Sequence, residues 1–579
     1  MSWRWKAKKW QAATLNEELT AQLTALKNQE QALEERFYKD LEFGTGGMRG
    51  MLGVGTNRMN IYMIRKVAEG LARYMDDLDE EVKQRGVVIA YDSRHKSKEF
   101  ALEVAKTIGA KGVKAYLFAG IRPTPELSFA VRYLHAFSGV VITASHNPPE
   151  YNGFKLYGED GAQITPEAST AIIQHMEAID ELSIEVAEEQ QLLEQNLLTY
   201  IGEEIDQPYI EQLMSIRLNE EVIHKAADDL TIVFTPLHGT AAEIVPKGLE
   251  AYGFKQVVTV KEQAEADPNF STVTSPNPED PNAFELAIEY GHRVDADLLL
   301  GTDPDADRLG VAVKNSQGVY EVLTGNQIGA LMLYYLLSQK KAQQRLPHNG
   351  VVLKTIVTSE LGRAIANDFG LQTVDTLTGF KYIAEKIKEY EMTDQYTFQF
   401  GYEESYGYLI ADFVRDKDAV QAALLISEVA AYYKMKGMSL YDGLQELFER
   451  YGWYHESLRS LTMTGKKGAQ QIAELFDGFR KHPWKEIAGV AVVEIEDYVT
   501  GKRHHLASDT KEIISLPQSD VLKYKLINDQ WICIRPSGTE PKIKFYFGVK
   551  EGSRAESKAM LMRLEQFMMD QVKEVTKSF

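Results

Sequence analysis

The feature that most constrains the fold of this chain is a pattern that occurs three times. In each copy an apolar strand, a polar loop, an amphipathic helix ending near glycine, and a second strand follow one another. The copies span residues 86–118, 230–260 and 350–377. They predict strands at 87–90 and 113–117, at 230–234 and 257–260, and at 351–353 and 372–376, with helices at 97–111, before Gly253, and at 359–369. Such βαβ units indicate α/β domains with mixed, mainly parallel sheets.

Beyond each copy a turn, a helix and a third strand follow, and each third strand leads into a loop of unusual composition. The third strands are predicted at residues 138–142, 297–300 and 396–400. Ligands of α/β sheets bind beyond the carboxyl ends of the strands, so all three loops lie where chemistry is expected. Because ligand sites form preferentially where domains meet, we expect one shared central cleft. Three independent domains with unrelated sites are the alternative.

The last part of the chain follows a different order. Strands at 521–527 and 531–534 are joined as in a hairpin, and a strand at 542–549 precedes a long amphipathic helix from about residue 555. This order predicts a small α+β domain. The acidic segment 177–206 is predicted to be helical and to end the first domain. The expected domains are 1–206 with a helical N-terminal extension, 207–322, 323–455 and 456–579.

A formal net charge of −20 over 579 residues argues against non-specific binding to nucleic acid or anionic membranes, because both require broad basic surface. No apolar run approaches the roughly 20 residues that cross a bilayer. The N-terminal segment lacks the apolar centre of a secretion signal. The single cysteine, Cys533, cannot form a disulfide within the chain. We expect a cytoplasmic protein in which any anionic ligand is bound by local groups of Arg and Lys.

The first unusual loop, residues 143–155, places Ser145 beside His146 and Lys155 in a tight turn directly after an apolar strand. A serine on a rigid turn can take up a covalent group if a cation or base offsets the charge that develops on it. The other interpretation is a turn capped by a hydroxyl. The remaining loops favour the nucleophile.

The second loop, residues 301–308, carries Asp303, Asp305 and Asp307 at alternate positions. Three hard oxygen donors on one side of a turn suit Mg²⁺. A calcium EF-hand is excluded because Arg308 and Lys314 stand where it needs glycine and glutamate. A solvated acidic turn is the alternative, although clustered like charges cost energy unless something neutralises them.

A C-terminal loop between two strands contains Arg535, Ser537, Gly538 and Thr539. It combines a guanidinium and two hydroxyls with a glycine that lets backbone N–H groups converge. These are the parts of an anion cradle, most naturally for phosphate. An ordinary connection between strands is the alternative, since Pro, Ser and Gly are common turn residues.

The third loop of the repeat contains Glu403 and Ser405, which can hydrogen-bond adjacent hydroxyls of a polyol. A second polar turn precedes it, formed by Thr378, Gly379 and Lys381. Polar pairs of this kind are common in loops. The two turns therefore support a sugar-binding site only in combination with the other motifs.

Two further segments contribute cations. Lys417, in the cluster 415–418, would lie near the same cleft, although a surface charge cluster is the commoner explanation. Arg49 lies in a glycine-rich turn, residues 44–50, whose glycines can equally serve only the backbone. Together the loops supply a nucleophile, a carboxylate metal site, a phosphate cradle and a hydroxyl-binding pair, which phosphoryl transfer requires.

The four motifs, in this order over nearly the whole chain, closely resemble the α-D-phosphohexomutase superfamily and its longer phosphoglucomutase-like and phosphopentomutase-like members. They are the serine loop (145–148), the metal loop (303–307), the sugar loop (403–405) and the phosphate loop (535–539). The resemblance implies four domains around one cleft and an isomerase that is an intramolecular phosphotransferase. It also implies that Ser145 is phosphorylated at rest and that Mg²⁺ binds this phosphoserine with Asp303, Asp305 and Asp307.

The implied reaction interconverts α-D-glucose 1-phosphate and D-glucose 6-phosphate through glucose 1,6-bisphosphate. Mannose, ribose and deoxyribose phosphates stay open as substrates, because a pentose and a hexose can present similar hydroxyls. A metal-dependent sugar phosphatase, with an aspartate of the metal loop as nucleophile, and a non-catalytic phosphosugar-binding protein are alternatives of a different class. The sequence does not set the oligomeric state, and a monomer agrees with it.

The resemblance also assigns roles around the reacting phosphate. Arg49, His146, Lys155 and Lys417 are its basic residues, and Lys417 is the candidate general base, a role that requires a lowered pKa. The expected substrate-binding residues are Arg308, Thr378, Gly379, Lys381, Glu403 and Ser405, and the expected phosphate-binding residues are Arg535, Ser537, Gly538 and Thr539. One departure is Tyr402, where many hexose mutases have glycine, and we expect it to alter the closing of the sugar loop.

Overall fold

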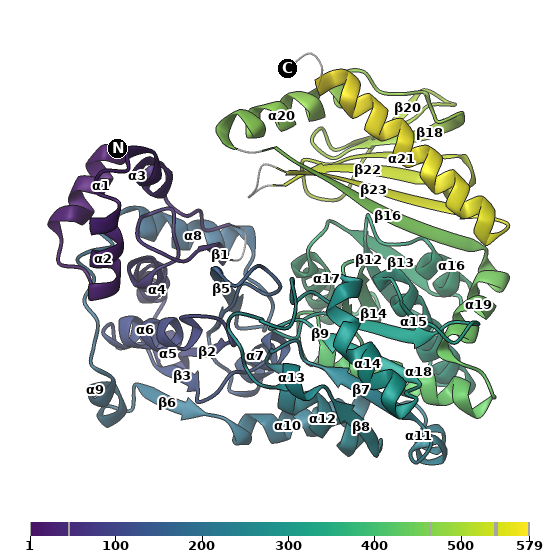
Figure 1. The fold of residues 1–579 in the computed structure, drawn as a ribbon, viewed down its shortest axis with the longest axis horizontal. Coiled ribbons are helices and arrows are strands. Elements are labelled where there is room, and N and C mark those ends of the chain that lie inside the picture. The colour runs from purple at the N-terminus through teal and green to yellow at the C-terminus, as the bar shows by residue number, and fades with distance from the viewer. Residues whose placement is uncertain (1, 45–46, 464, 538–541, 577–579) are drawn as a thin grey trace.

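The computed structural model describes residues 2–44, 47–463, 465–537 and 542–576. Three α/β units follow one another along the chain, and a C-terminal unit lies above the third in Figure 1. The N-terminal and C-terminal units face each other in the upper part of that view. No helix within the described ranges is long and apolar enough to cross a bilayer.

One strand order is repeated in all three α/β units. The first strand of each βαβ pattern lies between the second and third, parallel to both, and a fourth strand pairs antiparallel with the third. In that order the strands are β2 (Val87–Tyr91), β3 (Ala115–Phe118), β4 (Ser138–Ile142) and β5 (Tyr151–Gly158); β7 (Thr231–Thr235), β8 (Gln256–Thr259), β9 (Leu298–Thr302) and β10 (Leu309–Lys314); β12 (Gly350–Thr355), β13 (Gln372–Thr376), β14 (Thr397–Glu403) and β15 (Gly407–Leu409). The predicted α/β class with mixed, mainly parallel sheets is confirmed.

Short strands extend two of the sheets. In the first unit β1 (Gly47–Met51) pairs with β5, and in the second β11 (Tyr320–Val322) pairs with β10, both antiparallel. The order of the first sheet is β1-β5-β4-β2-β3-β6, with β6 (Leu198–Ile201) at the edge opposite β1. The predicted glycine-rich turn at 44–50 is largely strand β1, and because β1 pairs with β5, Arg49 is brought beside the serine loop, which lies between β4 and β5.

The segment 177–206 differs from the helical prediction. It contains the short helix α9 (Glu189–Glu194) but also strand β6 (Leu198–Ile201), which pairs parallel with β3 at the edge of the first sheet. Only its two end residues are buried. A four-residue edge strand is too short for an alternating pattern to stand out in a sequence. The predicted boundary at residue 206 falls within helix α10 (Glu203–Leu213), and the domain division itself stays a prediction.

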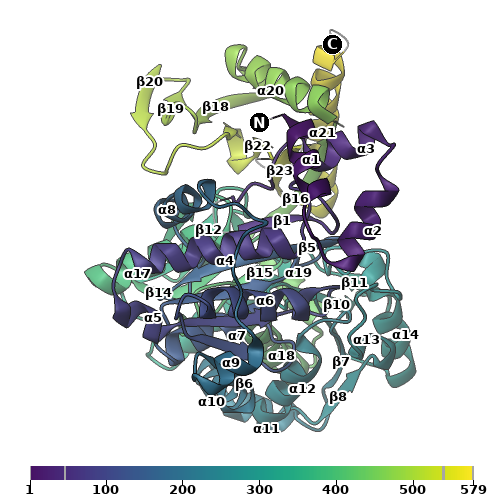
Figure 2. The same cartoon turned by 90° about the vertical axis from the view of Figure 1, so that its left-hand side faces the viewer.

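The helices of the three units pack on the sheets and on one another (Figures 1 and 2). They are α4 (Ile61–Asp76), α5 (Glu80–Arg85), α6 (Ser97–Gly109), α7 (Thr124–Tyr133) and α8 (Pro166–Glu177) in the first unit; α10, α11 (Glu220–Ala226), α12 (Ala241–Tyr252), α13 (Lys261–Ala264) and α14 (Glu285–Val294) in the second; α15 (Gly325–Ala342), α16 (Leu361–Asp368), α17 (Phe380–Thr393), α18 (Ala419–Met435) and α19 (Leu440–Tyr451) in the third. The first-strand loops and crossover helices thus follow the predicted pattern.

Helix α18 joins the second and third units. Its first turn is fixed by Asp418, whose Oδ1 accepts hydrogen bonds from the backbone N–H groups of Val420 and Gln421. Most of its side chains are buried, and a helix that is apolar on all sides belongs in a core. It contacts α11, α12 and α15, so one hydrophobic cluster runs through all three units. This shared core sets the positions of the loops that follow β4, β9 and β14.

The C-terminal unit is an antiparallel sheet covered by two helices, α20 (Gly465–Lys481) and α21 (Arg554–Thr576). Its strands are β16 (Trp453–Thr462), β17 (Glu486–Ile487), β18 (Val490–Asp497), β19 (Lys502–His505), β20 (Thr510–Ile513), β21 (Leu522–Leu526), β22 (Trp531–Pro536) and β23 (Lys542–Glu551). The main order is β16-β23-β22-β21-β18-β19-β20. The predicted hairpin of β21 and β22 is confirmed, whereas β16 to β20 were not predicted.

Three N-terminal helices, α1 (Trp3–Ala12), α2 (Glu17–Ala25) and α3 (Glu30–Phe37), cover one side of the first unit. Trp10 is fully buried, and its ring packs edge-on against the rings of Phe37 and Tyr62 at centroid distances of 5.8 and 5.4 Å. The indole Nε1 of Trp10 donates to Glu181 at 2.9 Å. The predicted amphipathic extension therefore has its own small core against α4.

Candidate active site

Ser145 lies three residues after the end of β4 in an unusual backbone conformation. Its φ of 51° lies in the left-handed region, which residues other than glycine adopt only under constraint. Its backbone N–H donates to Thr143 Oγ1 at 2.7 Å. Its Oγ donates to Asp303 Oδ2 at 2.7 Å and lies 3.0 Å from His146 Nδ1. The structure thus brings the predicted serine, histidine and metal loop into direct contact.

Arg94, which was not predicted from the sequence, binds the backbone of the serine loop. Its side chain is fully buried, and its guanidinium donates to the carbonyl oxygens of Ser145, Asn147, Pro148 and Tyr151. The bonds to Pro148 and Tyr151 measure 2.8 and 3.2 Å. The sequence feature that could have indicated a role for Arg94 is its position just after β2, at the same edge of the sheet as the predicted loops. Since one rigid fork binds four carbonyls, Arg94 fixes the backbone that presents Ser145.

The aspartate loop connects β9 to β10 and is held by one of its own carboxylates. Asp303 Oδ1 accepts hydrogen bonds from the backbone N–H groups of Asp307 and Arg308 at 3.1 and 3.0 Å. The three predicted ligands, Asp303, Asp305 and Asp307, are buried, and one oxygen from each lies within 4.8 Å of the others. The sequence thus predicted a cluster that does form.

Two lysines from other elements, Lys155 of β5 and Lys417 of the loop before α18, neutralise this cluster. Lys155 Nζ donates to Asp305 Oδ2 at 2.6 Å and to Asp307 Oδ2 at 3.0 Å. Lys417 Nζ lies 3.0 Å from Asp307 Oδ2 and 3.3 Å from Asp416 Oδ1. Burial acts to raise the pKa of Asp307, but the two lysines and Arg308 outweigh it and hold that pKa well below its ordinary value. Burial and the two neighbouring carboxylates raise the pKa of Asp303 well above its ordinary value.

The donor set of this cluster fits a divalent cation. Asp305 Oδ1 and Asp307 Oδ1 are buried, and within the described part of the chain neither has a hydrogen-bond partner, although Asp307 Oδ1 lies 3.8 Å from Arg308 Nε. Unpaired carboxylate oxygens in a protein interior are costly, which a hard cation with oxygen ligands relieves. A Mg²⁺ ion therefore suits the three aspartates, together with an oxygen carried by Ser145.

The carboxylates around Lys417 keep its ammonium charged. Burial lowers the pKa of Lys417, but Asp307, Asp416 and Glu403 outweigh this effect and leave the pKa raised. Its assignment as the general base stays a prediction. In this arrangement Lys417 is a charged donor that acts on both the metal loop and the sugar loop.

His146 and Arg49 lie on the other side of Ser145. Burial, followed by the charges of Arg308 and Arg49, lowers the pKa of His146 well below its ordinary value, so its imidazole is neutral. Arg49 projects from β1 opposite Gly153, and its Nη1 donates to Asn147 Oδ1 at 2.7 Å. Both predicted basic residues therefore adjoin the serine loop.

The sugar loop and the second polar turn are joined by one hydrogen bond. Glu403, the last residue of β14, accepts at Oε1 from the backbone N–H of Gly379 at 2.9 Å. Gly379 has a φ of 115°, which a side chain would strain. Burial raises the pKa of Glu403 to about 7, with Lys417 opposing the shift. Thr378, Lys381 and Ser405 are half-buried in the same region.

Tyr402 lies in the protein core and not in the sugar loop. It is fully buried and packs closely against Gly329 and Gly362. A Cβ atom at Gly329 would lie 2.5 Å from the Tyr402 ring, and a Cβ atom at Gly362 would lie 2.1 Å from the Tyr402 hydroxyl. Its hydroxyl has no hydrogen-bond partner among the described residues. The departure noted in the sequence is thus accommodated by two glycines of α15 and α16.

A cleft of about 990 Å³ separates the serine loop from the phosphate loop. Arg49, His146 and Lys155 line it on one side, and Arg535 and Ser537 on the other. The predicted phosphate-binding residues Gly538 and Thr539 lie outside the described residues. Arg308, the other predicted ligand of the substrate, is half-buried and paired with Glu279.

Two lysines of β23, Lys542 and Lys544, also line the cleft and were not predicted. Lys544 pairs directly across the sheet from Arg535, and like charges in this relation destabilise a sheet. Burial, followed by the charge of Arg535, lowers the pKa of Lys544. The spacing of Lys542 and Lys544 by two positions on a predicted strand, which places both side chains on one face, could have indicated this role. Such a pair of adjacent cations is stabilised when an anion lies between them.

Comparison with known proteins gives matches along nearly the whole chain. Family models for phosphoglucomutase/phosphomannomutase match in chain order: α/β/α domain I at residues 40–183, domain II at 207–318, domain III at 324–451 and the C-terminal domain at 469–564. A phosphoglucomutase of Staphylococcus haemolyticus is 41% identical over 517 residues, covering 89% of this chain and 91% of that protein. A phosphoglucomutase of Staphylococcus aureus is 40% identical over 525 residues, covering 90% and 92%.

Solved structures share the fold at lower identity. The open form of pp63/parafusin, a phosphoglucomutase of Paramecium, has a TM-score of 0.67 and 17% identity, with 93% of this chain and 96% of that chain covered. A phosphoglucomutase/phosphomannomutase family protein of Burkholderia thailandensis has a TM-score of 0.65 and 19% identity, with 92% and 97% covered. Helices α1 to α3 precede the first matched family model, which begins at residue 40.

Proposed function

This chain belongs to the phosphoglucomutase/phosphomannomutase family, and from that premise we propose that it interconverts α-D-glucose 1-phosphate and D-glucose 6-phosphate. It is an isomerase of the phosphohexomutase type. The observation that carries the proposal is the 2.7 Å hydrogen bond between Ser145 Oγ and Asp303 Oδ2, with a basic cleft opposite. The predicted cytoplasmic location remains part of the proposal.

Ser145 is the proposed carrier of the phosphoryl group. In the forward step the P–Oγ bond of phosphoserine breaks while the phosphorus bonds to a sugar hydroxyl oxygen, the proton of that hydroxyl passes in net balance to Ser145 Oγ, and a bisphosphate forms. In the return step the other phosphate of this bisphosphate moves to Ser145 Oγ, and the Oγ proton passes in net balance to the sugar oxygen that is released. In the structure the Oγ hydroxyl donates to Asp303 Oδ2, and the neutral imidazole of His146 also adjoins Oγ. Lys155 and Arg49 are placed to offset the charge of the transferring group.

Asp303, Asp305 and Asp307 would hold Mg²⁺ together with the phosphoserine, and the unpaired oxygens of Asp305 and Asp307 support this assignment. Bound there, Mg²⁺ supplies positive charge to the phosphoryl oxygens as the bond to Ser145 breaks. Lys155 and Lys417 keep Asp305 and Asp307 ionised. Lys417 also acts on Glu403, so it connects the metal loop with the sugar loop.

The remaining residues bind the sugar phosphate. Arg535, Ser537 and Lys544 are proposed to hold the distal phosphate, and Glu403 and Ser405 to bind hydroxyls common to both orientations of the sugar. Thr378, Gly379, Lys381 and Arg308 complete this region. A reaction in two halves needs such a site, because the bisphosphate presents first one phosphate and then the other to Ser145. Glucose 1,6-bisphosphate is accordingly the proposed intermediate and activator.

The test measures Mg²⁺-dependent conversion of α-glucose 1-phosphate beside ribose 1-phosphate, each primed with a catalytic amount of the matching bisphosphate, while free phosphate is monitored. We expect faster turnover of the glucose ester without phosphate release. Faster turnover of ribose 1-phosphate would reassign the substrate to a pentose and keep the mechanism. Steady phosphate release alone would indicate a metal-dependent phosphatase, and binding without turnover would indicate a phosphosugar-binding protein.

A further inference from the structure

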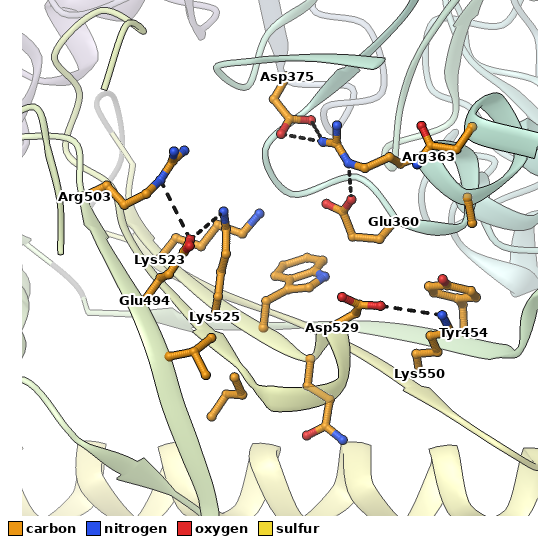
Figure 3. Close-up of a pocket in the computed structure, with 16 residues that line it drawn as sticks. Glu360, Arg363, Asp375, Tyr454, Glu494, Arg503, Lys523, Lys525, Asp529 and Lys550 are labelled. Atoms are coloured by element: carbon orange, nitrogen blue, oxygen red, sulfur yellow. Dashed lines mark hydrogen bonds and ion pairs between the residues drawn. The ribbon is translucent and has the colours of Figure 1, made fainter. Parts of the chain in front are cut away.

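A second cavity, of about 690 Å³, lies between the third unit and the C-terminal sheet (Figure 3). Its walls come from α16 and β13 on one side and from strands β18, β19, β21, β22 and β23 on the other. None of the candidate active-site residues lines it. Its volume falls in the range of small-molecule sites in proteins. We refer to it as the interunit pocket.

The wall from the third unit is electrically balanced. Arg363 donates to Glu360 at 2.7 Å and to both oxygens of Asp375 at 2.6 Å (Figure 3). Behind them, the buried Lys354 lies 3.0 Å from Glu360 and 3.1 Å from Asp375. Two cations therefore meet two carboxylates, and this wall has no charge left for a ligand.

The opposite wall is balanced in the same way. Lys525 lies 3.0 Å from Glu494 and 2.9 Å from Glu496, and Arg503 lies 2.7 Å from Glu496. At the far end of the pocket Lys550 lies 3.5 Å from Asp529. The cations of these strands that could attract an anion are thus already paired with carboxylates.

Lys523 is the exception. Its side chain reaches into the pocket from β21, yet the residue is only 3% exposed. Its Nζ donates to the backbone carbonyl of Ile356 at 2.7 Å and lies 4.9 Å from the ring centroid of Trp531. Among the described residues, no carboxylate lies within 4.0 Å of this ammonium, and the charges of Glu360 and Glu496 act on it only from a greater distance. A buried ammonium with one hydrogen-bond acceptor and no carboxylate in direct contact has donors to spare for an anion.

Trp531 lies beside this ammonium and contributes a small exposed part of its indole to the pocket lining. The residue is 4% exposed, and its ring lies across Gly548 of the neighbouring strand, where a Cβ would stand 2.3 Å from ring atoms. Glycine in a strand thus lets the indole lie flat against the sheet. The same indole belongs to the hydrophobic cluster that joins Ile356, Val357 and Leu377 to the C-terminal sheet. A site for an anion next to an apolar ring suits a small phosphorylated organic molecule better than a bare ion.

We propose that the interunit pocket binds a small phosphate monoester, with its phosphate on Lys523 Nζ and its organic part against Trp531. The phosphate of a sugar and that of a nucleotide offer the same chemistry to Lys523. They differ in what they place on the indole, since a planar base stacks on it and a sugar presents hydroxyls. The proposal does not depend on the proposed isomerase activity, because binding in this pocket needs no turnover.

The test titrates the full chain with inorganic phosphate, ribose 5-phosphate and adenosine monophosphate in an Arg535→Ala background, which weakens binding in the catalytic cleft. The readout is the part of the tryptophan fluorescence that is lost in the Trp531→Phe variant. We expect saturable changes with both esters, and the ester that binds more tightly identifies the source. Lys523→Met is expected to weaken binding at least about tenfold, since a charge-assisted hydrogen bond is lost.

Lys550→Met is the matched control, because this lysine lines the same pocket but is paired with Asp529. We expect it to change affinity by less than about twofold. Lys523→Gln keeps a donor for Ile356 and serves if the methionine variant does not fold. Unchanged affinity in both Lys523 variants, or no saturable signal from Trp531, would overturn the proposal. Failure of the isomerase assay would leave these results intact, so the two proposals fail separately.

Discussion

Ser145 Oγ donates a hydrogen bond of 2.7 Å to Asp303 Oδ2 across 158 positions of the chain. The contact connects the loop after β4 of the first unit with the loop after β9 of the second. Both loops leave the carboxyl end of a parallel strand in sheets with the same strand order. The nucleophile and the metal loop therefore meet because two copies of one fold pattern face each other.

Replacing the nucleophile tests the covalent route. Ser145→Ala is expected to lower kcat for glucose 1-phosphate by at least roughly 10³-fold, because no phosphoserine can form. The coupled assay for glucose 6-phosphate measures this loss, and mass spectrometry of the intact chain shows whether one phosphoryl group is carried. Ser183→Ala, at an exposed serine, is the control and is expected to keep full activity. Substantial turnover by the alanine variant would exclude a phosphoserine intermediate.

Removing the metal tests the aspartate cluster. Exhaustive chelation is expected to abolish turnover, and added Mg²⁺ to restore it, because the unpaired oxygens of Asp305 and Asp307 need a cation. Mg²⁺ is also expected to raise the Tm of the wild-type protein, since a ligand that binds only the native state stabilises it. Asp305→Asn is expected to lose this Tm increase, whereas Asp229→Asn, at an exposed position, keeps it. Full activity in chelator would contradict the assignment.

Arg94 tests the support of the serine loop. Arg94→Lys keeps the charge but loses the fork that binds four carbonyls. We expect kcat to fall about 10²-fold, since small displacements of a reacting group cost rates of this order. KM is expected to change little, because Arg94 contacts backbone and not the sugar. Arg73→Lys, on the surface of α4, is the matched control. An equal loss in KM and kcat would instead indicate direct substrate binding.

Glu403 predicts a pH dependence of substrate binding. Burial raises its pKa to about 7, so the carboxyl is largely neutral below that pH and ionised above it. An ionised carboxylate accepts stronger hydrogen bonds from sugar hydroxyls, so KM is expected to fall several-fold, up to roughly tenfold, as pH rises through 7. Glu403→Gln is expected to leave only the titration of the sugar phosphate itself. Identical KM profiles for the two proteins between pH 5.5 and 8.5 would refute this role.

The same shift sets the sign of a stability change. A carboxyl whose pKa is higher in the folded state binds more protons there than in the unfolded chain, so stability falls as pH rises from about 4.5 to 7. Glu403→Gln is expected to flatten this part of the curve of unfolding free energy against pH. Chemical denaturation at several pH values measures it.

Lys544 tests the phosphate loop. Lys544→Met is expected to raise KM for glucose 1-phosphate about tenfold or more, because it removes one of two adjacent cations that hold the distal phosphate. The variant is also expected to be no less stable than the wild type, since it removes a cross-strand pair of like charges. Lys511→Met, on the exposed strand β20, is the control. An unchanged KM would remove Lys544 from the phosphate site.

Most of the features that were predicted from the sequence depend on local patterns. The βαβ copies were visible because strand, helix and glycine recur within about 30 residues, and the serine and aspartate loops because their residues are close in sequence. β6 was missed because a four-residue edge strand has little pattern. Strands β16 to β20 lacked a comparable signal, since an antiparallel sheet has no crossover helices to mark its strands.

Residues whose role depends on distant partners were not predictable in this way. Arg94 acts on a loop about 50 positions later, and nothing near it in the sequence indicates four carbonyl partners. Lys544 becomes informative only when β22 and β23 place it across from Arg535. Lys417 was predicted as a site residue, but the direction of its pKa shift could not be predicted, because Asp307 and Glu403 are close to it only in the fold. Electrostatics thus required the tertiary structure.

The Tyr402 side chain occupies the space that side chains at Gly329 and Gly362 would need. A side chain at either glycine would strike the ring, and loss of the ring would leave a void. An ancestor could not have gained the tyrosine before both glycines without overcrowding this part of the core. The three positions are therefore expected to be inherited together, and relatives with a small residue at the position of Tyr402 to carry larger side chains at the other two. Lineages within the family could be ordered by this triplet even where the catalytic loops are identical.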